Sequence, residues 1–145
     1  MDFNNKVIWI TGASSGIGRA VAIEFSKLNT RLILSARNTE QLNETKALCS
    51  NSDNIKILSL DLAEYNLAKQ KVEEAINLFG TVDVLINNGG ISQRSLAKET
   101  PIEVDKKVFD VNYFGTVALT KALLPHLIEK KSGHIAVTSS VVGKF

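Results

Sequence analysis

Three glycines near the amino terminus are spaced so that they could hold a phosphate group. Gly12, Gly16 and Gly18 follow the apolar segment VIWI and open a segment with helical periodicity, in the stretch VIWITGASSGIGRAVAIEF. The first N–H groups of a helix lack intrahelical partners and, with the helix dipole, attract an anion. Gly12 would permit the tight turn, Gly16 would let a pyrophosphate approach the backbone, and Gly18 would let the helix pack closely. The stretch predicts a dinucleotide-binding turn, and a plain strand-to-helix turn is the alternative.

A charged side chain about 20 residues past such glycines decides which dinucleotide fits. An acidic residue would bind the ribose 2′-hydroxyl of NAD, whereas an arginine would favour the 2′-phosphate of NADP. The segment LILSAR ends at Arg37 without a carboxylate, and a planar guanidinium suits phosphate. NADP is therefore the expected cofactor. NAD stays possible because Glu40 lies one helical turn further on, and Arg37 could also be a solvated charge at a strand end.

Polar side chains also follow three later apolar segments. Asp61 could cap a helix that starts near Glu64, and the amides of Asn87 and Asn88 could close a strand end. Ser139 and Ser140 follow the last apolar segment, where a serine hydroxyl could bind its own backbone or orient a reacting group. For each of these residues a structural role stays open beside a functional one.

Short apolar segments alternate with amphipathic ones along the whole chain. The segments expected to be strands are Val7–Ile10, Leu32–Leu34, Ile55–Leu60, Val82–Ile86 and Ile135–Val137. Helices are expected over about 17–28, 39–50 and 64–79, with a long one reaching about 128; the first would bury a stripe formed by Ile17, Val21, Phe25 and Leu28. Strands apolar on both faces favour a parallel sheet covered by helices. The expected fold is therefore α/β, a doubly wound parallel (Rossmann) sheet of order 3-2-1-4-5.

Length and composition exclude several classes of protein. The chain has 145 residues, the size of one domain (residues 1–145), and a net charge of +2, which offers no bulk attraction for nucleic acid or membrane. One cysteine and two histidines form no metal-ligand cluster, so no metal is expected. No apolar run is long enough for a membrane span and no signal-peptide pattern precedes the first strand, which makes the cytoplasm the expected location.

Five short motifs together resemble the short-chain dehydrogenase/reductase family. TGASSGIG (11–18), DL (61–62), NNGG (87–90), VNYFGT (111–116) and VTSS (137–140) occur in the order and spacing of that family, and the resemblance covers the whole chain. The stretch NNGGISQRSL is similar to the subgroup known as dehydrogenase/reductase member 7. Gly89 stands where most of the family has alanine, a departure that this subgroup shares.

The resemblance assigns roles to residues of the matching motifs. It implies that Ser14 adds a hydroxyl to the 2′-phosphate, that Asp61 reaches the adenine ring, and that the backbone of Leu62 lines the same pocket. Asn112 would hold a water that relays protons, and Ser140, rather than Ser139, would orient the substrate carbonyl. The full set of expected cofactor contacts is Gly12, Ser14, Ser15, Gly16, Ile17, Gly18, Arg37, Asp61, Leu62, Asn88 and Gly89. A helix-packing amide is the alternative role for Asn112.

The family's proton donor does not follow Ser140 in this sequence. In the family a Tyr-x-x-x-Lys pair lies a little over a dozen residues past the serine, which here would be beyond residue 145. The pair Tyr65–Lys69 precedes both Asn112 and Ser140 and is not expected to serve, because a general acid must first be within reach of the reacting atom. We therefore expect the amino-terminal part of an NADP(H)-dependent carbonyl reductase or secondary alcohol dehydrogenase, inactive by itself. The whole protein would act on a small molecule as a homo-oligomer; a natural short form that binds a dinucleotide or a partner without catalysis is the alternative.

Overall fold

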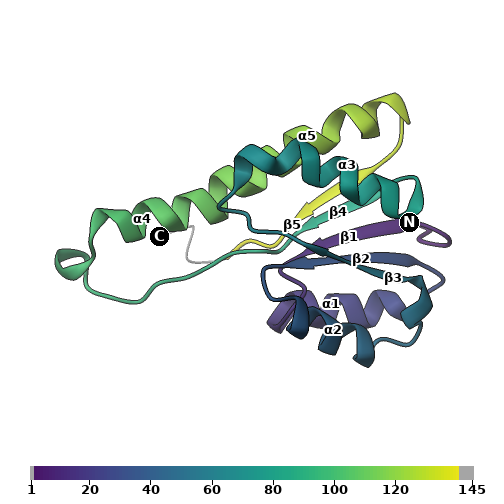
Figure 1. Cartoon of the computed structure of the whole chain (residues 1–145), viewed down its shortest axis with the longest axis horizontal. Helices are drawn as coiled ribbons and strands as arrows, with labels where there is room; N and C mark the ends of the chain where they lie inside the picture. Colours follow the sequence, from purple (N-terminus) through teal and green to yellow (C-terminus); the bar gives the residue numbers. More distant parts are fainter. Residues whose placement is uncertain (1, 141–145) are drawn as a thin grey trace.

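The computed structural model describes residues 2–140, which form one parallel sheet with helices on both faces (Figure 1). The strands are β1 (Val7–Thr11), β2 (Arg31–Ala36), β3 (Ile55–Ser59), β4 (Val84–Asn87) and β5 (His134–Val137), in the spatial order β3-β2-β1-β4-β5. The helices are α1 (Gly16–Ser26), α2 (Thr39–Leu48), α3 (Ala68–Phe79), α4 (Ile102–Phe109) and α5 (Thr116–Glu129). The predicted doubly wound fold and strand order are confirmed.

Alternate residues of the central strands pack into two separate hydrophobic cores, one on each face of the sheet. Val7 and Trp9 of β1 belong to the cluster that α3 and α5 cover, whereas Ile8 and Ile10 belong to the cluster that α1 and α2 cover. All four side chains are fully buried, which explains why β1 is a continuous apolar run instead of an alternating one. The indole N–H of Trp9 donates to Ser35 Oγ at 2.8 Å, so this large buried side chain leaves no unpaired donor.

Helix α1 does not bury the stripe that its sequence suggests. Its buried residues are Gly18, Ala22 and Ser26, while Ile17 is 61 % exposed at the helix start. The predicted stripe is wrong at its two ends, Ile17 and Leu28, because small residues let the helix approach the sheet closely and leave the larger side chains at the margin. Val21 and Phe25 are only partly buried beside that core.

The long helix predicted to reach about residue 128 contains an interruption. A π-helical turn over Asp110–Gly115 joins α4 to α5, and α4 projects beyond the sheet in Figure 1. The helix expected from residue 64 likewise begins with a 3₁₀ turn at Tyr65–Leu67 before α3. Across residues 2–140, no helix has the length and apolarity needed to cross a bilayer.

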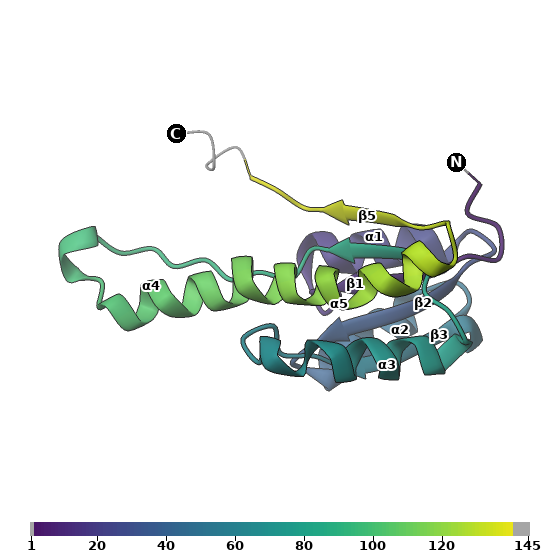
Figure 2. The same ribbon diagram turned by 90° about the horizontal axis from the view of Figure 1, so that it is seen from above.

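Strand β5 is an edge strand of the described sheet and pairs with β4 along one side (Figure 2). All four of its residues are exposed, including Ile135 and Val137, which are 36 % and 60 % exposed. Neighbouring residues of α5 add to this apolar surface: Leu124 is 37 % and Ile128 is 68 % exposed.

Asp83 joins the amino end of β1 to the carboxyl end of α5. Its Oδ1 accepts a hydrogen bond from Lys130 Nζ at 2.5 Å, and its Oδ2 accepts one from the backbone N–H of Val7 at 2.9 Å. Burial opposes ionisation of this carboxyl, but the hydrogen bonds from Lys130 and Val7 outweigh it, so the pKa of Asp83 lies below its usual value. The ionised carboxylate therefore stabilises the folded chain.

We expect Asp83→Asn to lower the free energy of unfolding at neutral pH by about 1–2 kcal/mol. Because the pKa of Asp83 is lower in the folded chain, the stabilisation is present above the unfolded pKa and is lost as the pH falls through the folded one. Urea unfolding from about pH 7 to pH 3 should therefore show wild type and variant converging at the acid end. Asp53→Asn, at an exposed aspartate without an ion pair in the described part of the chain, is the control. A constant gap at every pH would contradict this account.

Candidate functional site

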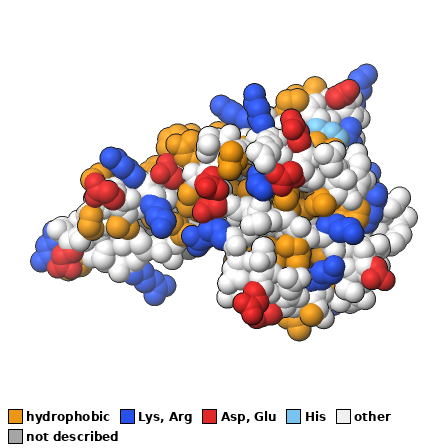
Figure 3. All heavy atoms as spheres, in the orientation of Figure 1, with side chains coloured by type: hydrophobic (Ala, Val, Ile, Leu, Met, Phe, Trp, Pro, Cys, Tyr) orange, Lys and Arg blue, Asp and Glu red, His pale blue; other side chains and the backbone are white. Residues whose placement is uncertain are grey.

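The carboxyl ends of all five strands border one cleft of about 1520 Å³. In the space-filling view the surface is hollowed between the projecting α4 and the layer formed by α1 and α2 (Figure 3). The expected site residues that line it are Gly12, Ser14, Ser15, Gly16, Ile17, Arg37, Asp61, Leu62, Asn88, Gly89, Asn112 and Ser140. Gly18 does not line the cleft. It lies buried in α1, directly under the turn.

The turn between β1 and α1 needs glycine for two different reasons. Gly12 and Gly16 have φ angles of +66° and +53°, in the left-handed region that side chains disfavour. A Cβ on Gly18 would overlap the carbonyl oxygen of Gly12, so the helix packs against the turn without any side chain between them. At Gly16 a Cβ would meet no heavy atom within 4 Å, which leaves open space over the first turn of α1.

Two side chains from the helices hold the carbonyl groups of this turn. Arg19 donates from Nε and Nη2 to the carbonyl oxygen of Ser14, at 3.1 and 2.6 Å. Thr45 of α2 donates to the carbonyl oxygen of Ala13 at 3.0 Å and accepts a hydrogen bond from Arg19 Nε. With both carbonyl groups bound on the helix side, the turn is braced in one conformation.

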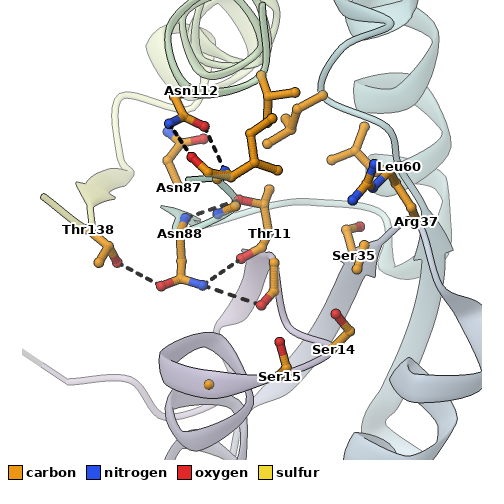
Figure 4. Close-up of a pocket in the computed structure, with 18 of the residues that line it drawn as sticks. Thr11, Ser14, Ser15, Ser35, Arg37, Leu60, Asn87, Asn88, Asn112 and Thr138 are labelled. Atoms are coloured by element: carbon orange, nitrogen blue, oxygen red, sulfur yellow. Dashed lines mark hydrogen bonds between the residues drawn. The ribbon is translucent and has the colours of Figure 1, made fainter. Parts of the chain in front are cut away.

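Asn88 is the side chain that ties the strand ends together (Figure 4). Its Nδ2 donates to the carbonyl oxygens of Thr11 and Gly12, both at 3.3 Å, and its Oδ1 accepts from Thr138 Oγ1 at 3.0 Å. The backbone N–H groups of Asn88 and Gly89 donate to Thr11 Oγ1 at 3.0 and 2.9 Å. Asn88 thus joins β1, β4 and β5, and its side-chain groups are already engaged.

Asn87 points away from this network. It is 3 % exposed, and its Nδ2 donates to Thr120 Oγ1 of α5 at 3.0 Å. Its Oδ1 is buried without a hydrogen-bond partner among the described residues. Of the two asparagines, Asn88 therefore connects the strands, while Asn87 fastens β4 to the helix behind it.

Asp61 both lines the cleft and supports its own loop. Its Oδ1 accepts a hydrogen bond from the backbone N–H of Ala63 at 2.9 Å, which closes a turn within the loop. The predicted helix cap is wrong, because the 3₁₀ turn and α3 begin after Glu64 and Leu67. Leu62, the residue after Asp61, fills the space beside Gly89, where a Cβ would come within 2.7 Å of Leu62 Cδ1. Leu62 thus occupies the space that an alanine at position 89 would need.

Three donors around the turn have no partner within residues 2–140. They are the hydroxyls of Ser14 and Ser15 and the guanidinium of Arg37, which all line the cleft. In Figure 4 both serine hydroxyls point into the cleft, and Arg37 extends from the end of β2 on the same side. Glu40 also lines the cleft. Its carboxylate is the group for which NAD was left as a possible cofactor.

The π-helical turn brings Asn112 against the loop that follows β4. Asn112 Oδ1 accepts from the backbone N–H of Ile91, and its Nδ2 donates to the carbonyl oxygen of the same residue, both at 2.8 Å. The amide thus has the packing role that was its alternative, and it also lines the cleft opposite the turn. Ser139 and Ser140 lie on the cleft wall beyond β5.

The pair Tyr65–Lys69 lies outside the cleft. Tyr65 begins the 3₁₀ turn before α3, and its ring packs against Phe114 with 5.8 Å between ring centroids. Neither Tyr65 nor Lys69 is among the lining residues. This placement agrees with the expectation that the pair is not positioned for proton transfer.

A family profile described as short chain dehydrogenase matches residues 6–145. The chain belongs to this family. It is 42 % identical to human dehydrogenase/reductase SDR family member 7 over 147 residues, covering 98 % of this chain and 43 % of the human protein. The Drosophila melanogaster protein called member 7-like is 48 % identical over 145 residues, with coverages of 97 % and 44 %. The chain thus spans less than half the length of these curated relatives.

Two solved structures of short-chain dehydrogenases share the fold closely. One, from Streptomyces avermitilis, has a TM-score of 0.90 and 34 % sequence identity, and the match covers all of this chain and 53 % of that one. The other, from Burkholderia phymatum and determined in complex with NAD, has a TM-score of 0.91 and 28 % identity, with coverages of 100 % and 52 %.

Four residues of this short-chain dehydrogenase cleft escaped the sequence reasoning. Thr11, Arg19, Thr45 and Thr138 all hydrogen-bond to the turn or to Asn88. Thr11 and Arg19 flank the glycine pattern and could have been suspected from their position alone. Thr45 has no local signal, and Thr138 lies in the VTSS motif without a role assigned to it, because their partners lie 32 and 50 residues away.

We expect Gly18→Ala to abolish dinucleotide binding, because the new methyl group would displace the carbonyl of Gly12 and distort the turn. Ala20→Gly is the matched control: Ala20 is exposed, so the change weakens α1 by about 1 kcal/mol without touching the turn. Isothermal titration of both variants with NADPH and NADH separates a damaged site from a merely weakened helix. Retained affinity in Gly18→Ala would show that the close packing of turn and helix is not required.

Proposed function

We propose that the cleft binds NADP(H) and forms the cofactor half of an oxidoreductase that reduces a carbonyl or oxidises a secondary alcohol. The observation that carries this proposal is the set of unpartnered donors, from Ser14, Ser15 and Arg37, around the open space at Gly16. Donors without partners at the start of a helix suit a ligand that brings phosphate oxygens. Membership of the short-chain dehydrogenase family supports a nicotinamide dinucleotide as that ligand.

The remaining parts of the cleft suit the rest of a dinucleotide. A pyrophosphate would lie over Gly16 at the first N–H groups of α1, where no side chain intrudes. The adenosine would lie toward β3, between Asp61, Leu62 and the backbone at Gly89. The nicotinamide end would then extend toward Asn112 and Ser140, past the crevice between β1 and β4 where the order of the strands reverses.

Arg37 favours NADP over NAD in this proposal. Its guanidinium has no hydrogen bond or ion pair with residues 2–140, so it remains available for a 2′-phosphate. Glu40, from the first turn of α2, forms no ion pair with it. The guanidinium of Arg37 and the hydroxyl of Ser14 line the same cleft, and together they match the oxygens of a 2′-phosphate better than a ribose hydroxyl.

Two residues of this chain would act on the substrate. When bound, the nicotinamide would supply or accept the hydride. The hydroxyl of Ser140 would donate to the substrate oxygen and so orient the carbonyl. Asn112 has one lone pair on Oδ1 and one hydrogen on Nδ2 left after its bonds to Ile91, and these could hold a water for proton relay.

The complete protein is proposed to be a homo-oligomer. Several large apolar side chains lie exposed on the arm that α4 and the π-helical turn form: Ile102 is 59 %, Phe109 60 %, Tyr113 56 % and Phe114 46 % exposed. An apolar surface of this kind on one element favours burial against another protein surface. A second copy of the chain is the simplest partner.

Chain 1–145 by itself is expected to show no carbonyl reductase turnover above background. No tyrosine or lysine lines the cleft in the described part of the chain, so an alkoxide has no positioned proton donor. General acid catalysis typically raises the reaction rate by about 10²–10⁴-fold. NADPH oxidation with a panel of aldehydes and ketones tests this, with Tyr65→Phe as the comparison. Turnover that disappears in Tyr65→Phe would contradict the proposed place of the chemistry.

Arg37→Asp should reverse the cofactor preference toward NADH, because it removes a charge-assisted contact and adds repulsion. The expected loss of NADPH affinity is about 1.5–3 kcal/mol, and NADH affinity should change far less. Arg94→Asp makes the same change of charge on an exposed loop outside the cleft and is the matched control. Equal NADPH affinity in Arg37→Asp and Arg94→Asp, measured by titration, would remove Arg37 from the site.

A further inference from the structure

We propose that Thr138 is a positioning residue that couples the glycine-rich turn to the Ser139–Ser140 segment through the side chain of Asn88. The inference rests on the proposed function for the identity of the ligand, but the coupling itself is a property of the unliganded chain. It assigns a task to the threonine of the VTSS motif, to which neither the resemblance nor the expected cofactor contacts give a role.

The direction of each hydrogen bond follows from the chemistry of the acceptors. The carbonyl oxygens of Thr11 and Gly12 can only accept, so the Nδ2 of Asn88 must face them. Its Oδ1 therefore faces Thr138, whose hydroxyl must donate, at 3.0 Å. One continuous path of three donated bonds thus runs from the end of β5 to the two carbonyl groups of the turn (Figure 4).

Thr138 holds the chain two residues before Ser140. Its backbone N–H donates to the carbonyl oxygen of Asn87 at 2.9 Å, which continues the pairing of β5 with β4. The hydroxyl adds a bond to Asn88, the next residue along. Strand β5 is exposed along its whole length, so its carboxyl end has little packing to hold it in place. The side-chain bond of Thr138 therefore matters more for position here than it would inside a core.

The turn is the part of the cleft that an anion would contact, and Asn88 packs directly against it. A Cβ on Gly12 or Gly18 would come within 3.0 or 2.6 Å of Asn88 Nδ2. Any change in the two carbonyl groups is thus passed to the Asn88 amide and, through Oδ1, to Thr138. Filling the phosphate site should therefore restrain Ser139 and Ser140. If the cofactor binds before the substrate, the two serines would then already be held in place when the substrate arrives.

A second amide–hydroxyl pair provides the internal comparison. Asn87 Nδ2 donates to Thr120 Oγ1 at 3.0 Å, which is also a bond between a strand-end asparagine and a threonine. This pair fastens β4 to α5 and does not contact the turn. Loss of either hydroxyl removes one similar bond, but only loss of the Thr138 hydroxyl should uncouple the turn from Ser140.

Hydrogen exchange on chain 1–145 tests the coupling, with wild type compared to Thr138→Val, Thr138→Ser and Thr120→Val. Without ligand, Thr138→Val should speed exchange of the Asn88 and Gly89 amides by roughly 2- to 10-fold, the factor that one net hydrogen bond supplies. Thr138→Ser should restore the wild-type rates, and Thr120→Val should leave these two amides unchanged. With saturating NADPH, the amides of Ser139 and Ser140 should be protected in wild type and Thr138→Ser but not in Thr138→Val.

The outcomes distinguish a failure of the coupling from a failure of the proposed function. If wild type fails to bind NADPH or NADH, the proposed function is wrong, and the exchange rates without ligand still decide the coupling. If wild type binds NADPH and the amides of Ser139 and Ser140 do not change, the coupling is refuted even if Thr138→Val proves unable to fold. Equal rates at Asn88 and Gly89 in wild type and Thr138→Val also overturn it.

Discussion

The hydrogen bonds from the Asn88 amide to the carbonyl groups of Thr11 and Gly12 are the interaction on which the cleft depends. A turn whose carbonyl groups are bound from behind presents the hydroxyls of Ser14 and Ser15 to the cleft. Arg19 and Thr45 bind the next two carbonyl groups of the turn from the side of the helices. The glycines make this arrangement sterically possible, but the side-chain bonds keep it in one conformation before any ligand arrives.

The order of the strands explains why one asparagine can do this. Strand β1 lies at the centre of the sheet, with β2 on one side and β4 on the other, so the chain leaves β1 and β4 toward opposite faces. The crevice between them at the carboxyl edge is the place where doubly wound sheets bind ligands. The backbone after β4 must pass close to the turn after β1, and Gly89 and Leu62 show how little space is left there.

Much of the fold and part of the site could be predicted from the sequence, because their signals are local. The apolar runs and their alternation with amphipathic segments gave the five strands and their order, and the spacing of Gly12, Gly16 and Gly18 located the turn. The α1 stripe was predicted wrongly at Ile17 and Leu28, because periodicity does not show that Gly18 and Ala22 let the helix approach the sheet. Thr45 and Thr138 were missed, since their partners are brought to them only by the tertiary fold. Asp61 and Asn112 show that a structural role and a place in the cleft can belong to the same side chain.

We propose that the cleft is formed before binding in a conformation that takes a dinucleotide, with the pyrophosphate over the turn. Titration of the ¹⁵N-labelled chain with NADPH, followed by amide chemical shifts, tests it most directly. We expect the largest changes on residues 12–18, on Arg37, and on residues 61–62 and 88–90, all around one cleft. Changes concentrated instead on the exposed groove formed by Leu124, Ile128 and Ile135, with the turn unaffected, would contradict it.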